Sequence, residues 1–513
     1  MGGGSTRWQA ADRGYVLLVA VFCGIFFAAR VWMSQTLGVD DVEQVIYAQG
    51  FRLSYEPSQP PLYTWLLWLA FESLGVSVSS VALIRYGLLF LSYVFLQRYA
   101  RRILPDAWQA NLAAASVSLV YLVGWGAHGG FTHSTLLMTC MNATLWASAR
   151  LAESSRTRDY AILGVTLGLG LLSKHNYALV PVGLVVAGLL QPALRARLAD
   201  RRLALTALIA VAIVAPTLGW LVGAPDLRHA LSITVMHQYH SSAPPHARPA
   251  PLLALREYTQ FSLAFLFPFF PVALALLPQG LVPLRAPTPM AFDALRLLRD
   301  YILAVWLLLA LACLAGVLTT LETRWLHPVL LWLPLLYVAR ALLNGAGRRW
   351  VHCYIGLLVA ANLALAGLWT AQPWLGGKLK LCGKQCRLFA PYPALAQAVA
   401  EAGFRTGTIA AGDEFIGGNL RLAFPHAAVL VPQYAAWQPG KSAGNGDCLV
   451  VWNTFRQGLT PPAELADLLR ARFALDPVSL PVPLELIAAN RVVQKQVLHF
   501  AFVVIPGGIG GCR

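Results

Sequence analysis

Two adjacent aspartates near the N-terminus carry the side chains of this sequence best suited to acid–base chemistry. Asp40 and Asp41 follow a long apolar segment and precede Val42, Val45 and Ile46, which recur at helical spacing. A short amphipathic helix is therefore expected, and Asp40 either caps it or acts on a substrate. A carboxylate within hydrogen-bond reach of a hydroxyl can remove its proton, which typically accelerates a reaction by about 10²- to 10⁴-fold.

Cationic side chains stand at the ends of two later apolar segments, where they could bind an anion. Lys174 follows an apolar segment with an uncharged interior, and Arg324 comes shortly before another apolar segment, together with His327. Fixed cations lower a barrier when negative charge develops in the transition state, and arginine matches phosphate with two hydrogen bonds. The structural alternatives are a lysine that extends to the membrane interface and histidines that, like His133, only form hydrogen bonds at the membrane rim.

The composition shows what kind of scaffold must position these groups. The chain has 513 residues, of which 57% are hydrophobic and 12% charged, and its mean hydropathy is +0.59. Soluble proteins carry about 25% charged residues, so polar side chains are too few to cover a water-soluble body of this size. The composition therefore argues against a soluble enzyme, a nucleic-acid-binding module and a disordered scaffold. The net charge of +16 is explained by arginines in loops beside a membrane.

Eleven apolar stretches approach the length of about 20 residues that a membrane-spanning helix needs. They cover residues 14–34, 80–100, 108–127, 133–151, 159–173, 176–194, 203–223, 261–284, 300–319, 328–345 and 351–372. The first has no convincing cleavage site and is expected to remain as an anchor. We therefore predict an all-α polytopic membrane protein with about eleven transmembrane helices.

Alternate loops between these stretches are rich in arginine, whereas the intervening loops hold only scattered basic residues. The positive-inside rule places the arginine-rich loops and the N-terminus in the cytoplasm, and an odd number of crossings puts the tail outside. Four cysteines of the tail agree with disulfides in an oxidising compartment, although the first two could instead bind a metal. They are Cys382, Cys386, Cys448 and Cys512, and the sequence does not reveal their pairing.

The tail, residues 376–513, is more polar than the segment 1–375 and long enough to fold as a domain of its own. Its pattern predicts a small α/β domain, with helices near 391–403 and 464–473 and strands near 408–412, 427–431, 449–452 and 491–505. The pairs Gly417-Gly418 and Gly507-Gly508 are expected in turns. The first outer loop, residues 35–79, should form interfacial helices, the second of them over 60–74 with aromatic residues on it.

Four motifs together resemble the GT-C glycosyltransferases of the PMT_2 group, which includes the bacterial aminoarabinose and galacturonic acid transferases of lipopolysaccharide. The first motif is the acidic pair, followed about twenty residues later by a polar residue and Pro-Pro-Leu. The other three lie at outer ends of predicted helices, at residues 131–134 (FTHS), 168–177 (GLGLLSKHNY) and 324–328 (RWLHP). The resemblance covers roughly residues 14–345 and, more loosely, the tail.

The resemblance implies transfer of a sugar from a polyprenyl-phosphate carrier to a lipid or lipopolysaccharide, with inversion, on the periplasmic face of a bacterial inner membrane. Asp40 takes the position of the general base, and Asp41 that of a residue that orients the acceptor or binds a metal. Donor phosphate binding falls to Lys174, Arg324 and His327. The implied substrate-binding residues are Gln59, Tyr63, His133, His175 and Glu56. No cofactor is implied with certainty, and a divalent metal is possible.

Two departures from the family pattern bear on this mechanism. Many relatives have Asp where this chain has His133, and many have Glu-Lys or Asp-His where it has Ser58-Gln59. The first departure weakens a mechanism with two carboxylates, and the second leaves more of the phosphate binding to Lys174 and Arg324. Two alternatives stay open: a protein O-glycosyltransferase with the same donor, and a lipid or sugar transporter. A receptor-like scaffold would explain neither the acidic pair nor Lys174.

The long outer loop over residues 223–260 is rich in histidine, proline and serine. His237 and His240 have the i, i+3 spacing of two zinc ligands on a helix. We expect instead a loop that closes over the donor, because such lids exclude water from glycosyl transfer.

Overall fold

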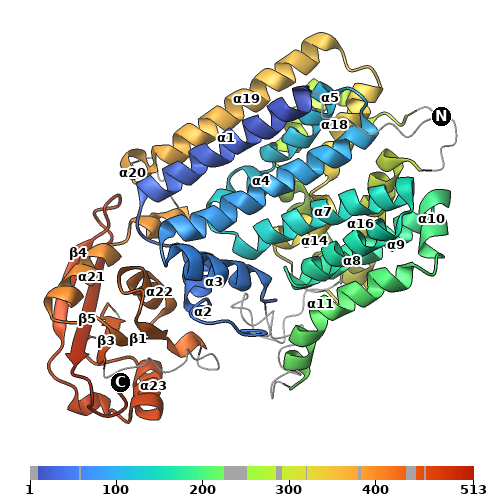
Figure 1. Ribbon diagram of the computed structural model, residues 1–513. Coiled ribbons are helices and arrows are strands. Elements are labelled where there is room, and N and C mark those ends of the chain that lie inside the picture. Colours follow the sequence, from blue (N-terminus) through green and yellow to red (C-terminus); the bar gives the residue numbers. More distant parts are fainter. Residues whose placement is uncertain are drawn as a thin grey trace. The chain divides into compact units, whose positions relative to one another are not determined.

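The computed structural model describes residues 10–56, 59–223, 251–284, 292–318, 321–378, 383–434, 446–455 and 458–512 (Figure 1). The chain divides into two compact units. Unit 1 comprises residues 1–24, 57–62 and 87–365, and unit 2 comprises residues 25–56, 63–86 and 366–513. This grouping differs from the predicted division after residue 375, because most of the first outer loop packs with the tail.

Five described helices are long and apolar enough to cross a membrane: α1 (Ala10–Met33), α4 (Val78–Ile103), α11 (Leu203–Gly223), α16 (Ala294–Leu314) and α19 (Arg348–Thr370). Two bent helix pairs raise this number to seven if each pair is one span. They are His175–Leu189 with Pro192–Leu198 and Thr323–Leu330 with Leu333–Leu343. The predicted all-α polytopic membrane fold is thereby confirmed, while the other predicted stretches form helices that are shorter or less apolar.

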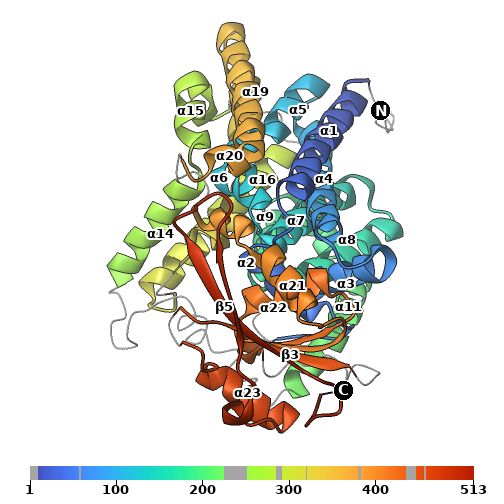
Figure 2. The same ribbon diagram turned by 90° about the vertical axis from the view of Figure 1, so that its left-hand side faces the viewer.

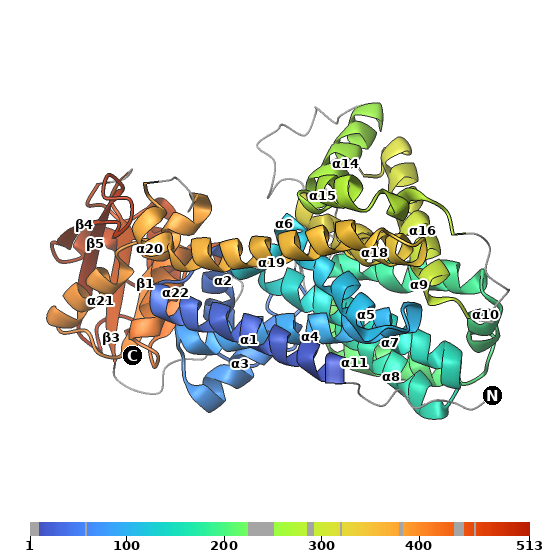
Figure 3. The ribbon, with the colours of Figure 1, turned by 90° about the horizontal axis from the view of Figure 1, so that it is seen from above.

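Those remaining helices belong to unit 1: α5 (Ala107–Ala115), α6 (Tyr121–Gly124), α7 (Thr132–Ser154), α8 (Thr157–Leu171), α14 (Pro251–Phe265) and α15 (Phe269–Leu276). Helices α8 and α11 run side by side (Figures 1 and 3). Their backbones approach closely because α8 has glycines at the contact: a Cβ at Gly164 would lie 2.7 Å from the carbonyl oxygen of Thr206. Small residues favour such close packing of membrane helices.

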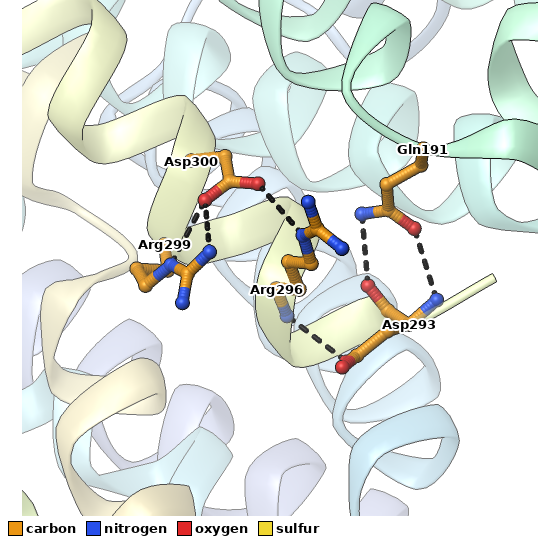
Figure 4. A network of polar contacts seen from close by, with 5 residues as sticks. All are labelled: Gln191, Asp293, Arg296, Arg299 and Asp300. Carbon is orange, nitrogen blue, oxygen red and sulfur yellow. Dashed lines mark hydrogen bonds and ion pairs between the residues drawn. The ribbon is translucent and has the colours of Figure 1, made fainter. Parts of the chain in front are cut away.

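A polar network fixes the beginning of α16 in unit 1 (Figure 4). The Asp293 side chain caps the helix by accepting from the backbone N–H of Arg296, and the Gln191 amide forms two hydrogen bonds with the Asp293 backbone. Asp300 pairs with Arg296 (3.3 Å) and Arg299 (2.7 Å). Two arginines of one predicted cytoplasmic loop are thus partly neutralised within their own helix.

The C-terminal part of unit 2 is a small α/β domain, as predicted. Its sheet has the order β2-β1-β3-β5-β4, with β1 parallel to β2 and β3, and β5 antiparallel to β3 and β4. The strands are β1 (Gly407–Ala411), β2 (Ala428–Leu430), β3 (Asp447–Asn453), β4 (Leu484–Ala489) and β5 (Val497–Ile505). Helices α21 (Tyr392–Glu401) and α22 (Glu414–Ala423) cover one face and α23 (Ala463–Phe473) the other (Figure 2).

Two details of the predicted domain are wrong. Strand β4 precedes the stretch in which it was expected, and α22 replaces the turn expected at Gly417-Gly418. These glycines lie inside α22 because the helix is packed tightly on both sides. A Cβ at Gly417 would lie 2.9 Å from Val429, and one at Gly418 would lie 2.8 Å from Val42 of α2 (Val39–Tyr47). Gly507-Gly508 lies in a turn as expected.

The described cysteines of the tail are disulfide-bonded, which agrees with the prediction for an oxidising compartment. Cys448 of β3 is joined to Cys512, and Cys386 is also in a disulfide; Cys382 lies outside the described residues. Within the described ranges, no group of three or more histidine, cysteine, aspartate or glutamate side chains is arranged to hold a metal ion.

Candidate active site

The acidic pair lies in the first turn of α2, as part of unit 2. Gly38 is the N-cap of this helix, so the alternative that Asp40 serves as the cap is wrong. Both carboxylates benefit from the positive end of the helix dipole, but their surroundings differ. Asp40 is partly exposed, whereas Asp41 is 1% exposed.

Asp41 forms a buried ion pair with Arg85 of α4, in which neither side chain exceeds 2% exposure. The pair offsets the cost of burying two charges, and removal of either partner would leave the other charge uncompensated. Nearby, Arg30 of α1 donates to the carbonyl oxygens of Ser34 (2.8 Å) and Thr36 (2.7 Å), which shapes the turn leading to α2. The Asp41 carboxylate is therefore used to anchor α2.

Helix α22 of the α/β domain holds α2 at both ends. Before α2 begins, the backbone N–H of Leu37 donates to the Asn419 side chain (2.7 Å). At the other end of α2, Arg421 donates to the carbonyl oxygens of Val45 and Ala48. A cation at this position also interacts favourably with the negative end of the helix dipole. The contact at Gly418 lies between these anchors. The position of Asp40 within unit 2 thus depends on residues more than 350 positions later in the chain.

Carboxylates gather around this helix in what we term the acidic cluster: Asp40, Glu43, Glu56 and Glu414. Burial, followed by repulsion from Glu56, Asp40 and Glu414, raises the pKa of Glu43 well above its usual range. Glu56 accepts a hydrogen bond from the Tyr47 hydroxyl (3.0 Å), and Glu414 of α22 accepts one from Tyr434. Burial also raises the pKa of Glu414.

Tyr63 is buried in α3 (Leu62–Leu74), within the same unit as Asp40 and Asp41. Gln59 belongs to unit 1 and is partly buried. The segment that contains it is tied to the end of α8, because the backbone N–H of Leu62 donates to the carbonyl oxygen of Leu172 (3.2 Å). This bond brings the Pro-Pro-Leu motif close to the segment that carries Lys174.

Two further motifs meet in unit 1. The Lys174 ammonium donates to the Ser134 hydroxyl (3.0 Å), and the imidazole Nδ1 of His133 lies 3.2 Å from the carbonyl oxygen of Ser173. His133 is buried at the start of α7, Lys174 is partly exposed and His175 is exposed. Residues 131–134 and 168–177 are therefore in contact.

The motif at residues 324–328 also contacts the motif at residues 168–177, through a backbone carbonyl oxygen. The Asn176 amide donates to the carbonyl oxygen of Trp325 (3.0 Å), and the Nδ1 of buried His327 lies 2.6 Å from the carbonyl oxygen of Arg324. Arg324 also pairs with Glu322 (2.5 Å). We term Lys174, Arg324, His133 and His327 the basic group. These side chains can bind an anion, and all come from the ends of unit 1 helices.

The predicted residues thus fall into two sets. Unit 1 holds Gln59, His133, Lys174, His175, Arg324 and His327, and unit 2 holds Asp40, Asp41, Glu56 and Tyr63. That Asp40 and Lys174 line one cavity stays a prediction, because they belong to different units. The histidines of the long outer loop, including His237 and His240, lie outside the described residues.

Sequence reasoning missed Arg85, Glu414 and Arg421. A signal existed for Arg85, because an arginine inside an apolar stretch is costly unless a carboxylate pairs with it. None existed for Glu414 and Arg421, which are polar residues of a polar tail and acquire their contacts only when α22 packs on α2.

Comparisons with known proteins bear on the family and the class of enzyme. Residues 58–220 match the family model of dolichyl-phosphate-mannose-protein mannosyltransferases, PMT_2. The chain is similar to lipopolysaccharide core galacturonosyltransferase RgtA of Rhizobium johnstonii, with 29% identity over 460 residues, 85% of this chain and 86% of that protein. It is also similar to RgtB of the same organism, with 27% identity over 464 residues, 89% of this chain and 90% of that protein.

A solved structure shows the same fold. The crystal structure of ArnT from Cupriavidus metallidurans bound to undecaprenyl phosphate has a TM-score of 0.60 and 15% identity, and the match covers 96% of this chain and 98% of that one. The resemblance to the GT-C glycosyltransferases of the PMT_2 group is confirmed, and with it a multi-pass membrane glycosyltransferase.

Proposed function

We propose that this chain moves a sugar from a polyprenyl-phosphate carrier to a lipid or lipopolysaccharide acceptor on the periplasmic face of a bacterial inner membrane, with inversion at the anomeric carbon. The N-terminus would face the cytoplasm, and residues 376–513 would form a periplasmic domain. Similarity to two lipopolysaccharide core galacturonosyltransferases over most of the chain supports the acceptor class and makes galacturonic acid the first sugar to test.

In the proposed reaction, Asp40 removes the proton of an acceptor hydroxyl while the hydroxyl oxygen bonds to the anomeric carbon. The bond from that carbon to the carrier phosphate breaks at the same time, and polyprenyl phosphate leaves. The observation that carries the choice of base is the contrast within the acidic pair: Asp40 is partly exposed, and Asp41 is buried against Arg85.

Three members of the basic group, Lys174, Arg324 and His327, would hold the departing phosphate. Lys174 and Arg324 supply fixed positive charge. His327 donates its Nδ1–H to the carbonyl oxygen of Arg324, so it would donate to the phosphate from Nε2 as the imidazolium. This role is supported by the contacts that bring their three motifs together in unit 1.

Five more residues would position the substrates without taking the proton. They are Gln59, Tyr63, His133, His175 and Glu56. Asp41 would act only through α2, by keeping Asp40 in place.

Mass spectrometry of lipopolysaccharide and membrane lipids tests this proposal. Cells that produce the protein should contain a species heavier by one sugar, and cells with Asp40→Asn at equal membrane abundance should lack it. A heavier protein fraction with unchanged lipids would identify a protein O-glycosyltransferase instead. Full transfer by Asp40→Asn would show that Asp40 is not the base. A chelator added to an assay with purified protein tests whether a divalent cation takes part.

A further inference from the structure

In unit 1, α1 begins beside the end of α4 (Figure 1). A basic hollow lies at this place. Its volume is about 600 Å³, and four arginines line it: Arg98, Arg101 and Arg102 of α4 and Arg150 of α7. None of these residues belongs to the basic group or to the acidic cluster. The hollow therefore calls for an explanation of its own.

The carboxylates of the hollow do not balance its arginines. Asp12 lies 3.3 Å from Arg101, and Glu153 lies 2.9 Å from Arg102. These two carboxylates face four arginines, which leaves an excess of two positive charges in the lining. Asp159, which pairs with Arg150 at 2.7 Å from outside the lining, reduces the excess to one.

The arginines are also largely withdrawn from water. The side chains of Arg101, Arg102 and Arg150 are 12%, 17% and 27% exposed. Burial of a charge is costly unless an opposite charge compensates it. An orientation signal under the positive-inside rule needs only arginines in a loop, so this clustering around a hollow points to an anion.

One part of the wall of the hollow is apolar. Val94, Phe95 and Trp146 line it, and the two rings stand 5.6 Å apart. The Arg150 guanidinium stacks over Trp146 at 5.0 Å from the ring centroid. Basic pockets between membrane helices bind lipid headgroups, and tryptophan is typical of the membrane–water interface.

We propose that the basic hollow binds a phosphate group, from the headgroup of an anionic phospholipid or from free phosphate. The arginines receive the phosphate, and the apolar wall suits the first carbons of an acyl chain. This site is separate from sugar transfer, and its test does not depend on the proposed function.

Full-length protein in detergent provides the test, by native mass spectrometry and thermal unfolding. Phosphatidylglycerol should bind and raise Tm, and phosphatidylcholine should do neither. An arginine in contact with the bound headgroup contributes about 1 kcal/mol, which is roughly fivefold in affinity. Arg98→Gln with Arg102→Gln should therefore weaken binding roughly 25-fold.

Two matched variants separate the site from general charge and from misfolding. Arg348→Gln with Arg349→Gln removes the same charge from exposed residues in the first turn of α19 and should leave binding unchanged. Glu153→Gln removes a carboxylate of the lining and should strengthen binding about fivefold, which a damaged fold cannot do.

Inorganic phosphate at equal headgroup concentration distinguishes the two sources. Equal protection by phosphate and phosphatidylglycerol would identify the free anion, and protection by the lipid alone would identify the headgroup. The proposal is overturned if phosphatidylcholine binds equally well, if the α19 variant weakens binding as much as the α4 variant, or if Glu153→Gln weakens it.

Discussion

The acidic cluster of unit 2 and the basic group of unit 1 are stabilised over very different distances along the chain. Around Asp40, the contacts of α2 reach Asn419 and Arg421, which are 382 and 376 positions away from their partners. Around Lys174, the contacts reach Ser134 and Trp325, at separations of 40 and 149. The acidic cluster thus depends on the C-terminal domain, whereas the basic group is assembled by the helices of unit 1.

This difference gives the α/β domain a structural role. Helix α22 supplies two hydrogen-bonding side chains to the ends of α2 and one glycine to its middle. It also contributes Glu414 to the acidic cluster. Variants of the domain should therefore affect the chemistry attributed to Asp40 before they affect anion binding by the basic group.

The largest effect is expected for Asp40→Asn, which keeps the size of the side chain and removes the base. We expect kcat to fall by about 10²- to 10⁴-fold with little change in thermal stability. Transfer from a polyprenyl-phosphate sugar to purified acceptor measures it. A kcat within threefold of wild type would show that the acidic cluster does not supply the base.

Asp41→Asn should affect stability instead. The change leaves the Arg85 charge buried without its partner, which typically costs about 3–5 kcal/mol. Thermal unfolding in detergent measures the loss, and Asp41→Asn with Arg85→Gln should recover part of it because no isolated charge remains. A single variant as stable as wild type would contradict the anchoring role.

Lys174→Gln should weaken use of the donor. A hydrogen bond to a charged group is worth about 1.5–3 kcal/mol, so kcat/KM for the donor should fall roughly 10- to 100-fold. Lys174→Arg should retain much of the activity, and Ser134→Ala, which removes only the partner of the ammonium, should cost less. Equal activities of Lys174→Gln and wild type would move phosphate binding to other residues.

Arg421→Gln should lower kcat about tenfold and leave the KM for the donor unchanged, because α2 loses a C-terminal anchor. Arg470→Gln is the matched control: it lies in the same domain, its side chain is 56% exposed, and its loss should have no effect. A rise in donor KM without a fall in kcat would show that Arg421 acts on donor binding, which is attributed to the basic group, and not on Asp40.

The smallest effect concerns pH and stability. Because burial and the nearby carboxylates raise the pKa of Glu43, the folded protein holds a proton that the unfolded chain releases. The bound proton stabilises the folded protein. This stabilisation is fully present below the ordinary Glu pKa of 4.5 and is lost as the pH rises through the raised pKa of Glu43. Glu43→Gln should therefore gain stability over wild type, on the order of 1 kcal/mol, as the pH rises from 5 to 8.

Thermal unfolding across that pH range checks this, with the exposed Glu401→Gln as the control. Parallel pH profiles of Glu43→Gln and wild type would show that the cluster around Glu43, which contains Asp40, Glu56 and Glu414, does not raise its pKa.

Local patterns were enough to predict much of this protein. Long apolar runs predicted the membrane helices, and alternating strand and helix patterns predicted most of the C-terminal domain. The four motifs predicted the glycosyltransferase class. Each motif is a short run of neighbouring residues, so it can be recognised without knowledge of the fold. The patterns failed at α22, where Gly417-Gly418 suggests a turn unless the contact with Val42 is known.

What the sequence determined by itself is therefore the membrane setting, most of the helices and strands, and the residue types available for chemistry. Only the tertiary structure decided that Asp40 is partly exposed while Asp41 is buried with Arg85, and that Arg421 holds the end of α2. The physical reason is that burial and ion pairing depend on which distant segments pack together, and two adjacent aspartates are identical until that packing separates them.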